Sequence, residues 1–259
     1  MKVFILCGGF GTRLDNTGKL IAKTMISIRN KPILIHILEN FLEQGFHEFV
    51  ICGGHKIETI ENYFLKKKKK IIHKAKSHLS LNTFIKNKNI TIDIIDTGKK
   101  TGTGGRLKKA YKKLKLDSDF LATYGDGLSN LSIKKLIKFH YKNKSLITLT
   151  AVKPKQRYGI LKIKNNKVRF FDNSKKKSDV FINGGFFVIS KKIINLIKDD
   201  KIYLENEPFK KILKIGKLFS YKYNGFWASM DTLKDKNDLE KLARKSRKLP
   251  WKPNFKNLK

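Results

Sequence analysis

The sequence predicts an α/β fold in which a mixed, mostly parallel sheet carries an added antiparallel portion in its second half. Up to about residue 144, short apolar runs alternate with segments whose apolar residues recur at helical spacing. That alternation is typical of a mainly parallel sheet covered by helices on both faces. From residue 145 onward, strand-like runs follow one another with turn residues between them, which indicates antiparallel structure.

The first half is expected to contain four strands that alternate with four helices. The clearest helix covers residues 31–45, where Ile33, Ile37 and Phe41 recur at helical spacing. A proline near its start and a glycine at its end are common at helix termini. The expected strands are residues 3–6, 49–54, 90–98 and 120–127, and the other expected helices are residues 56–65, 104–114 and 132–143.

The second half is expected to add antiparallel strands and a closing helix. Strand-like stretches cover residues 145–153, 158–171 and 180–190, a further strand pair covers 216–232, and a helix covers 234–249. No internal repeat of solenoid period is visible. The chain length of 259 residues favours a single domain, residues 1–259, with halves at 1–150 and 151–259.

Residues 66–89 are expected to form a polar excursion that opens with five consecutive lysines, Lys66 to Lys70. A solvated run at the end of the preceding helix, where cations suit the helix dipole, is favoured over a dedicated polyanion site. The excursion is long enough to act as a lid or as a subunit contact, so a homo-oligomer is one expectation.

The net charge of +37 first suggests nucleic acid or an anionic membrane as a partner. Only seven of the 58 basic residues are arginine, however, and the lysines are scattered over every segment. Base readout relies on arginine, and no segment has the roughly 20 apolar residues of a membrane span. We therefore expect no nucleic acid and no membrane as partners, but faster encounter with polyanions such as nucleoside triphosphates.

The two cysteines, Cys7 and Cys52, each stand at the end of an apolar run. Buried thiols in a reducing cytoplasm are their expected state, and the N-terminal apolar stretch is too short for a signal peptide. We therefore expect a cytoplasmic protein. The six histidines show no zinc-binding spacing.

A glycine-rich turn, "CGGFGTRL" at residues 7–14, follows the first expected strand. It matches neither of the two common phosphate loops, because the glycine or lysine that each requires is missing. Three glycines still let backbone amides approach an anion closely, and Arg13 adds a charged donor fork. Nucleotide binding is thus slightly favoured over the alternative, a strand-to-loop turn that needs positive φ.

Two aspartates at the ends of expected strands add to this loop. Asp126 stands in "YGDG" and Asp231 in "FWASMDT", while Lys23 follows the glycine loop. Two carboxylates that converge on a polyphosphate suit Mg²⁺-dependent phosphoryl or nucleotidyl transfer. Either aspartate taken alone is explained equally well by a local turn.

Several motifs in order resemble the sugar-phosphate nucleotidylyltransferases, and among them the cytidylyltransferases that act on glucose 1-phosphate. They are "GGFGTRL", "KTM", "NKPIL", "DTGKKTGTGGRLKK", "YGDGLSNLSIKKLIKFH", "NGGFFV" and "GFWASMDT". The likeness runs from residue 2 to about Lys252. It implies a Rossmann-like nucleotidyltransferase fold, with nucleotide binding in residues 1–150 and acceptor binding in residues 151–259.

The resemblance also implies the reaction and the residues. CMP would pass from CTP to a sugar 1-phosphate, nominally glucose 1-phosphate, giving a CDP-sugar and pyrophosphate without a protein nucleophile. Arg13 and Lys23 would be catalytic, and Asp126 with Asp231 would hold Mg²⁺. The nucleotide would contact Leu6, Gly8, Gly9, Gly11, Thr12, Arg13, Thr101, Thr103 and Arg106, and the acceptor would contact Tyr158, Gly159, Asn183 and Gly184.

Two departures from the family pattern keep alternatives open. Thr24 replaces a proline, which we expect only to loosen a loop. Asn173 and Ser174 replace a Glu-Lys pair that contacts the sugar and its phosphate, so another phosphorylated acceptor is an alternative to glucose 1-phosphate. A nucleotide-binding regulator or nucleic-acid binder without turnover is a further alternative, but such a protein needs no pair of metal carboxylates.

Overall fold

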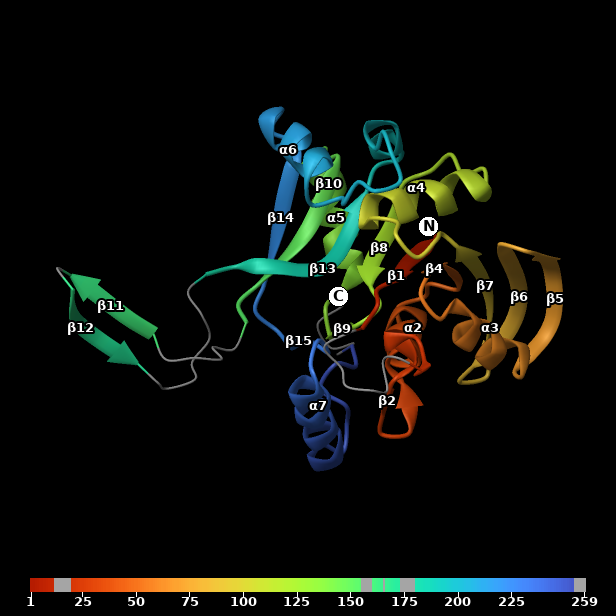
Figure 1. The fold of residues 1–259 in the computed structure, drawn as a ribbon, viewed down its shortest axis with the longest axis horizontal. Coiled ribbons are helices and arrows are strands. Elements are labelled where there is room, and N and C mark those ends of the chain that lie inside the picture. Colours follow the sequence, from red (N-terminus) through yellow and green to blue (C-terminus); the bar gives the residue numbers. More distant parts are fainter. Residues whose placement is uncertain (12–19, 155–159, 165, 173–179, 254–259) are drawn as a thin grey trace.

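The computed structural model describes residues 1–11, 20–154, 160–164, 166–172 and 180–253. A nine-stranded sheet forms its centre (Figure 1). In spatial order the strands are β14 (Leu218–Tyr223), β10 (Ile147–Val152), β13 (Ile182–Ile189), β8 (Phe120–Tyr124), β1 (Val3–Cys7), β4 (Glu48–Gly53), β7 (Lys88–Asp96), β6 (His78–Ile85) and β5 (Lys68–Ala75). Strands β8, β1, β4 and β7 are parallel, and β13 and β6 flank them antiparallel. The mixed sheet with a parallel centre is thus confirmed.

Three two-stranded sheets lie outside the central sheet. They pair β2 (Ser27–Ile28) with β3 (Lys31–Pro32), β9 (Gly127–Ser129) with β15 (Trp227–Ser229), and β11 (Ile160–Lys164) with β12 (Lys167–Asp172). Figure 1 shows the β11–β12 hairpin standing apart from the central sheet.

Helices cover both faces of the central sheet, as the alternation of strands and helices predicts. One face packs against α2 (Ile33–Glu43), α3 (Ile57–Leu65), α5 (Ile133–Lys142) and α7 (Leu233–Lys245). The other packs against α4 (Thr103–Lys113), α6 (Glu207–Lys214) and the short 3₁₀ helix Lys191–Leu196. Of these, α6 is a helix that the sequence pattern did not predict.

Strand β1 shows why its sequence is apolar throughout. Val3, Ile5 and Cys7 point into one core, whereas Phe4 and Leu6 point into the other. A strand with helices on both faces has no solvated side, so its apolar run is continuous rather than alternating. Cys7 and Cys52 are buried free thiols, as predicted.

The expectation of a polar excursion at residues 66–89 is wrong. Strands β5 and β6 form an antiparallel hairpin that extends the sheet beyond β7, so this segment is part of the sheet rather than a lid. Leu79 and Leu81 are buried on one face of β6, but serine and threonine residues beside them hid this alternation. Lysines 68–70 are exposed on β5, an edge strand, where charged side chains discourage pairing with other chains.

Two expectations for the second half also need correction. The strands within residues 216–232 do not pair with each other, because β14 runs parallel to β10 while β15 pairs with β9. Residues 158–171 do not form one strand either. The described part of this stretch is the β11–β12 hairpin, with positive φ at Asn166 in the turn.

The fold brings the ends of several strands to one edge. Because β1, β4, β7 and β8 are parallel, the loops after them leave the sheet on the same side. No helix in the described part of the chain combines the length and the apolar character needed to cross a bilayer.

Candidate active site

A cleft of about 1130 Å³ opens at this edge of the sheet. Every predicted site residue within the described ranges lines it: Leu6, Gly8, Gly9, Gly11, Lys23, Thr101, Thr103, Arg106, Asp126, Asn183, Gly184 and Asp231. Four other predicted site residues, Thr12, Arg13, Tyr158 and Gly159, lie outside the described residues, as do Asn173 and Ser174. Residues predicted from six separate segments therefore share one cavity.

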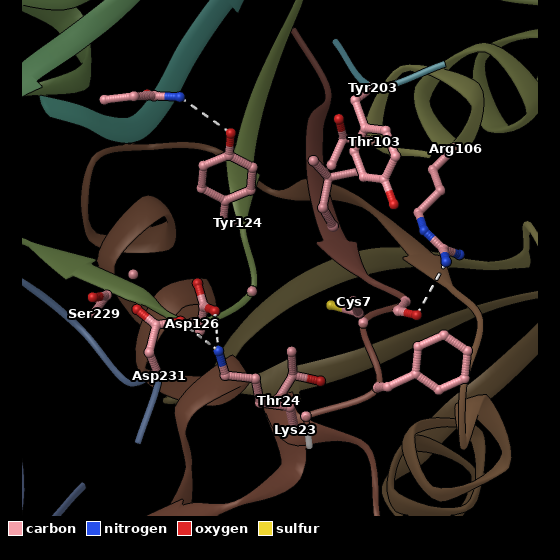
Figure 2. A pocket seen from close by; sticks show the side chains of 18 of the residues that line it. Cys7, Lys23, Thr24, Thr103, Arg106, Tyr124, Asp126, Tyr203, Ser229 and Asp231 are labelled. Carbon is pink, nitrogen blue, oxygen red and sulfur yellow. Dashed lines mark hydrogen bonds and ion pairs between the residues drawn. The ribbon is translucent and has the colours of Figure 1, made fainter. Parts of the chain in front are cut away.

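Lys23 joins the two predicted metal-binding aspartates. Its Nζ lies 2.5 Å from Oδ2 of Asp126 and 2.9 Å from Oδ1 of Asp231 (Figure 2). The three side chains come from positions 103 and 208 residues apart along the chain. Two carboxylates and one ammonium meet at a single point in the cleft.

The pairing of β9 with β15 explains why the two aspartates meet. Gly127 is paired with Ser229 in this small sheet, and the backbone N–H of Met230 donates to the carbonyl of Asp126 at 2.9 Å. Asp231 lies two residues after the end of β15 and directly before Thr232, the N-cap of α7. Its backbone N–H donates to the Asp235 carboxylate, which also forms a capping box with Thr232.

The electrostatics of this cluster favour a charged lysine. Burial opposes the ammonium form, but Asp126 and Asp231 outweigh it and raise the pKa of Lys23 above its ordinary value. Burial also raises the pKa of the Asp126 carboxyl, and the Lys23 ammonium opposes that shift. Lys23 therefore acts as a cation here rather than as a proton acceptor.

Arg106 lines the cleft, but its hydrogen bonds go to the protein. Nη1 donates to the carbonyls of Gly53 and Gly98 and to the Thr97 hydroxyl, at 2.7–2.9 Å. Nη2 donates to the carbonyls of Gly8 and Lys99. The guanidinium thus connects the end of β4 with the loops after β1 and β7.

The position of Arg106 also explains why residues 8 and 54 are glycine. A Cβ on Gly8 would lie 2.0 Å from Cζ of Arg106, and a Cβ on Gly54 would lie 2.5 Å from its Nη1. The guanidinium can lie against the backbone only because both residues lack a side chain. Gly8 has this structural reason for being glycine in addition to the predicted approach of a nucleotide.

Thr24 and Cys7 also line the cleft. Thr24 is buried, and its methyl group lies where a Cβ on Gly125, next to Asp126, would collide with it. Burial raises the pKa of Cys7 to about 12, so this thiol stays protonated and is not a nucleophile.

Among the residues that were not predicted from the sequence are Tyr124, Tyr203 and Trp227, which line the cleft, and Glu205, which hydrogen-bonds to Tyr124. Tyr124 and Trp227 lie within the quoted motifs "YGDG" and "FWASMDT", so these motifs were a signal that could have identified them. Trp227 Nε1 donates to the carbonyl of Gly184 at 2.7 Å. Tyr203 lies beside Thr103 (Figure 2) and Glu205 follows in the same loop, where no motif drew attention.

The arrangement can bind and orient anions, but its described residues offer no activated nucleophile. Backbone amides after β1, the Lys23 ammonium and a pair of carboxylates suit polyphosphate held with a divalent cation. Together with the parallel sheet and its strand-end cleft, they define an enzyme of the nucleotide-dependent transferase class.

Comparison with known proteins agrees with this class. The chain matches the nucleotidyl transferase family over residues 2–225, and we conclude that it belongs to that family. It is 40% identical to a glucose-1-phosphate cytidylyltransferase of Salmonella typhimurium, over 97% of this chain and 99% of that protein. It is 35% identical to a probable glucose-1-phosphate cytidylyltransferase of Bacillus subtilis, with the same coverage. The resemblance found in the motifs is confirmed.

A solved structure agrees with the fold. HddC from Yersinia pseudotuberculosis superposes with a TM-score of 0.67 and 25% identity, over 92% of this chain and 96% of that chain. A putative glucose-1-phosphate thymidylyltransferase from Bacillus anthracis, at 17% identity and a TM-score of 0.68, shares the fold.

Proposed function

We propose that the protein transfers a cytidylyl group from CTP to a sugar 1-phosphate and releases pyrophosphate, with glucose 1-phosphate as the first expected acceptor. The observation that carries the proposal is the convergence of Lys23, Asp126 and Asp231 at one point of the cleft. The relatives of 40% and 35% identity, both named for this reaction, support the choice of CTP and of glucose 1-phosphate.

Mg²⁺ fits the donor atoms that the cleft offers. The described residues contain no group of three or more His, Cys, Asp or Glu side chains that could hold a metal on their own. Two carboxylates are nevertheless what Mg²⁺ takes when phosphate oxygens and water complete its shell. Asp126 and Asp231 would hold it, and the bound ion would offset charge on the phosphates.

The ammonium of Lys23 lies between these carboxylates in the structure. Metal binding there requires the ammonium to move, and a phosphate oxygen of the nucleotide is the anion that would receive it. Lys23 would thus occupy two positions. In the free enzyme it would neutralise the carboxylates, and in the complex it would contact a phosphate group of the nucleotide. The catalytic function predicted for Lys23 would be exerted in the second position.

The reaction needs positioning more than covalent chemistry. A phosphate oxygen of the acceptor attacks the α-phosphorus of CTP, the bond from that phosphorus to the bridging oxygen breaks, and pyrophosphate leaves. The barrier includes repulsion between two anions, which amides of the glycine loop and Lys23 would reduce. Thr12 and Arg13 are proposed to act beside them.

The acceptor is proposed to bind on the side of β13, where Asn183 and Gly184 line the cleft. Replacement of the family's Glu-Lys pair by Asn173 and Ser174 favours a second candidate, transfer to a different phosphorylated acceptor. Lysines 175–177 follow directly and offer replacement charge, so glucose 1-phosphate stays first.

The test is pyrophosphate release from CTP with a panel of sugar phosphates and small phosphate esters, repeated with UTP, GTP and ATP. Efficient release with CTP and glucose 1-phosphate is the expected result. Release with a different acceptor would support the second candidate, and no release with any pair would overturn the proposed function.

A further inference from the structure

A series of hydrogen bonds in the wall of the cleft joins the nucleotide side to the acceptor side. The Glu205 carboxylate is its centre: Oε1 accepts from the Tyr124 hydroxyl, and Oε2 accepts from the Thr103 hydroxyl at 2.6 Å. Thr103 begins α4 on the nucleotide side. Tyr124 ends β8, two residues before Asp126, and faces β13.

The series continues from Tyr124 to Asn183. Asn183 Nδ2 donates to the Tyr124 hydroxyl oxygen at 3.1 Å, and Asn183 Oδ1 accepts from the backbone N–H of Gly185 at 2.9 Å (Figure 2 shows the bond at Tyr124). In this orientation of the Asn183 side chain, both the nitrogen and the oxygen of its amide form hydrogen bonds. The second N–H of this amide is not used by these bonds, and Asn183 lines the cleft.

Glu205 sets the direction of this series. An ionised carboxylate only accepts, so the Tyr124 proton must point toward Glu205 and the Tyr124 oxygen must accept from Asn183. Burial and then Glu205 raise the pKa of Tyr124, which keeps its hydroxyl protonated. With the tyrosine proton committed to Glu205, the opposite orientation of the Asn183 amide would lose both of its bonds.

Two further observations indicate that the residues around Glu205 and Tyr124 are suited to these hydrogen bonds. Within the described part of the chain Glu205 forms no ion pair, and its carboxylate bonds to two hydroxyl groups, although the protein carries 58 basic residues. Gly185 has a φ of +76°, and a Cβ there would lie 2.3 Å from Cδ2 of Tyr124. The glycine lets the tyrosine ring lie against β13 while its N–H holds Asn183.

We propose that Glu205 is a positioning residue that acts through Tyr124 to hold Asn183 with an N–H directed at the acceptor. This inference rests on the proposed function, in which Asn183 contacts the acceptor. An N–H suits the phosphate and hydroxyl oxygens of a sugar phosphate, whereas the flipped amide would present its carbonyl oxygen to the acceptor phosphate. Glu205 does not line the cleft and so acts without touching substrate.

The experiment compares Glu205→Gln and Tyr124→Phe with the wild type in steady-state kinetics. Glutamine can direct an N–H toward Tyr124 and so reverse the donor-to-acceptor direction of these hydrogen bonds. Phenylalanine removes the hydroxyl group to which Asn183 donates. We expect each variant to raise KM for the acceptor about tenfold or more, the scale of a misplaced polar contact, while KM for CTP changes by less than about twofold. Glu207→Gln, an exposed change two residues away on α6, is the matched control.

A second background separates positioning from general structure. In Asn183→Ala enzyme, Glu205→Gln should cause no further loss of kcat/KM for the acceptor, because Asn183 is the residue through which it acts. Equal losses in both backgrounds, or equal increases of KM for CTP and for the acceptor, would overturn the inference.

A spectroscopic measurement decides the inference even without turnover. The side-chain amide signal of Asn183 in ¹⁵N NMR, assigned by its loss in Asn183→Ala, should shift strongly in Glu205→Gln and in Tyr124→Phe but not in Glu207→Gln. An unchanged signal would overturn the inference. A wild type that turns over no acceptor would overturn the proposed function instead.

Discussion

Lys23 determines how charge is balanced in the cleft. Its ammonium lies between Asp126 and Asp231, and these three side chains together carry a formal net charge of −1 when both carboxylates are ionised. A divalent ion would neutralise both carboxylates and release Lys23. At the scale of single residues, we therefore expect metal and nucleotide binding to be coupled, because each would favour the same movement of one side chain.

The first prediction concerns this coupling. Lys23→Met should reduce kcat by about 10²-fold or more, the scale of losing one charged donor in the transition state. The same variant should bind Mn²⁺ more tightly than the wild type in the absence of nucleotide, since no ammonium competes for the carboxylates. Electron paramagnetic resonance of free Mn²⁺ measures this affinity.

Three controls define that experiment. Lys100→Met changes a lysine that lines the same cleft without contacting either carboxylate, and it should leave the Mn²⁺ affinity unchanged. Asp126→Asn should abolish both Mn²⁺ binding and turnover, and Asp238→Asn on the exposed side of α7 should abolish neither. Equal Mn²⁺ affinity in Lys23→Met and wild type would contradict competition by the lysine.

A second prediction tests the contact between Gly8 and Arg106. Gly8→Ala should lower the free energy of unfolding, because its Cβ would displace the guanidinium from its backbone acceptors. In the Arg106→Ala background the same change should cost less, with a coupling energy of about 1–3 kcal/mol. Gly9→Ala is the matched control, since a Cβ there meets nothing within 4 Å. Additive losses in urea unfolding would show that the two residues do not interact.

The same pair shows what single residues reveal in a sequence. The glycine loop was recognisable because glycines cluster after an apolar strand. The reason why residue 8 is glycine was not recognisable, because Arg106 lies 98 residues away and only the fold brings the two residues together. Glu205 could not be found at all, since its hydrogen bonds depend on a loop without any motif.

At the scale of elements, the pairing of β9 with β15 brings together the two aspartates proposed to hold the metal. Asp231 lies between β15 and α7, whose capping box fixes the local backbone. Strand propensity placed β15 but could not choose its partner, so the sequence suggested pairing with β14. Partner choice depends on the path of the chain between strands, which a local pattern does not contain.

The third prediction uses two helix caps as a matched pair. Thr232→Ala removes the cap of α7 and Ser132→Ala removes the cap of α5, and each should cost about 1 kcal/mol of unfolding free energy. Only Thr232→Ala should also lower kcat, because Asp231 is the preceding residue. Urea unfolding and steady-state rates on the same samples measure both quantities. An equal effect of the two variants on kcat would contradict a link between the α7 cap and Asp231.

At the scale of the whole molecule, the parallel centre of the sheet was predictable because it depends on repeated alternation over about 140 residues. The edges were predictable only in part. β14 was expected as a strand but with the wrong partner, and β5 was missed, because neither strand has a fully buried residue and the lysines of β5 suggested a polar excursion. The cleft was predictable for the same reason as the centre, since strand ends in such sheets gather on one side.

The last prediction concerns the charge of +37. CTP is a polyanion, so an excess of cations should speed its capture, and added salt should screen this effect over a Debye length of about 10 Å at 0.1 M. We therefore expect kcat/KM for CTP to fall several-fold between low and high NaCl, provided that capture limits the rate.

Lys99 and Lys100 are exposed and line the cleft, whereas lysines 69 and 70 lie on the edge strand β5. Changing the first pair to glutamine should lower kcat/KM and flatten its salt dependence. Changing the second pair should alter neither, because screened charges act only at short range. Equal effects of both pairs would show that net charge, rather than charge near the cleft, governs capture.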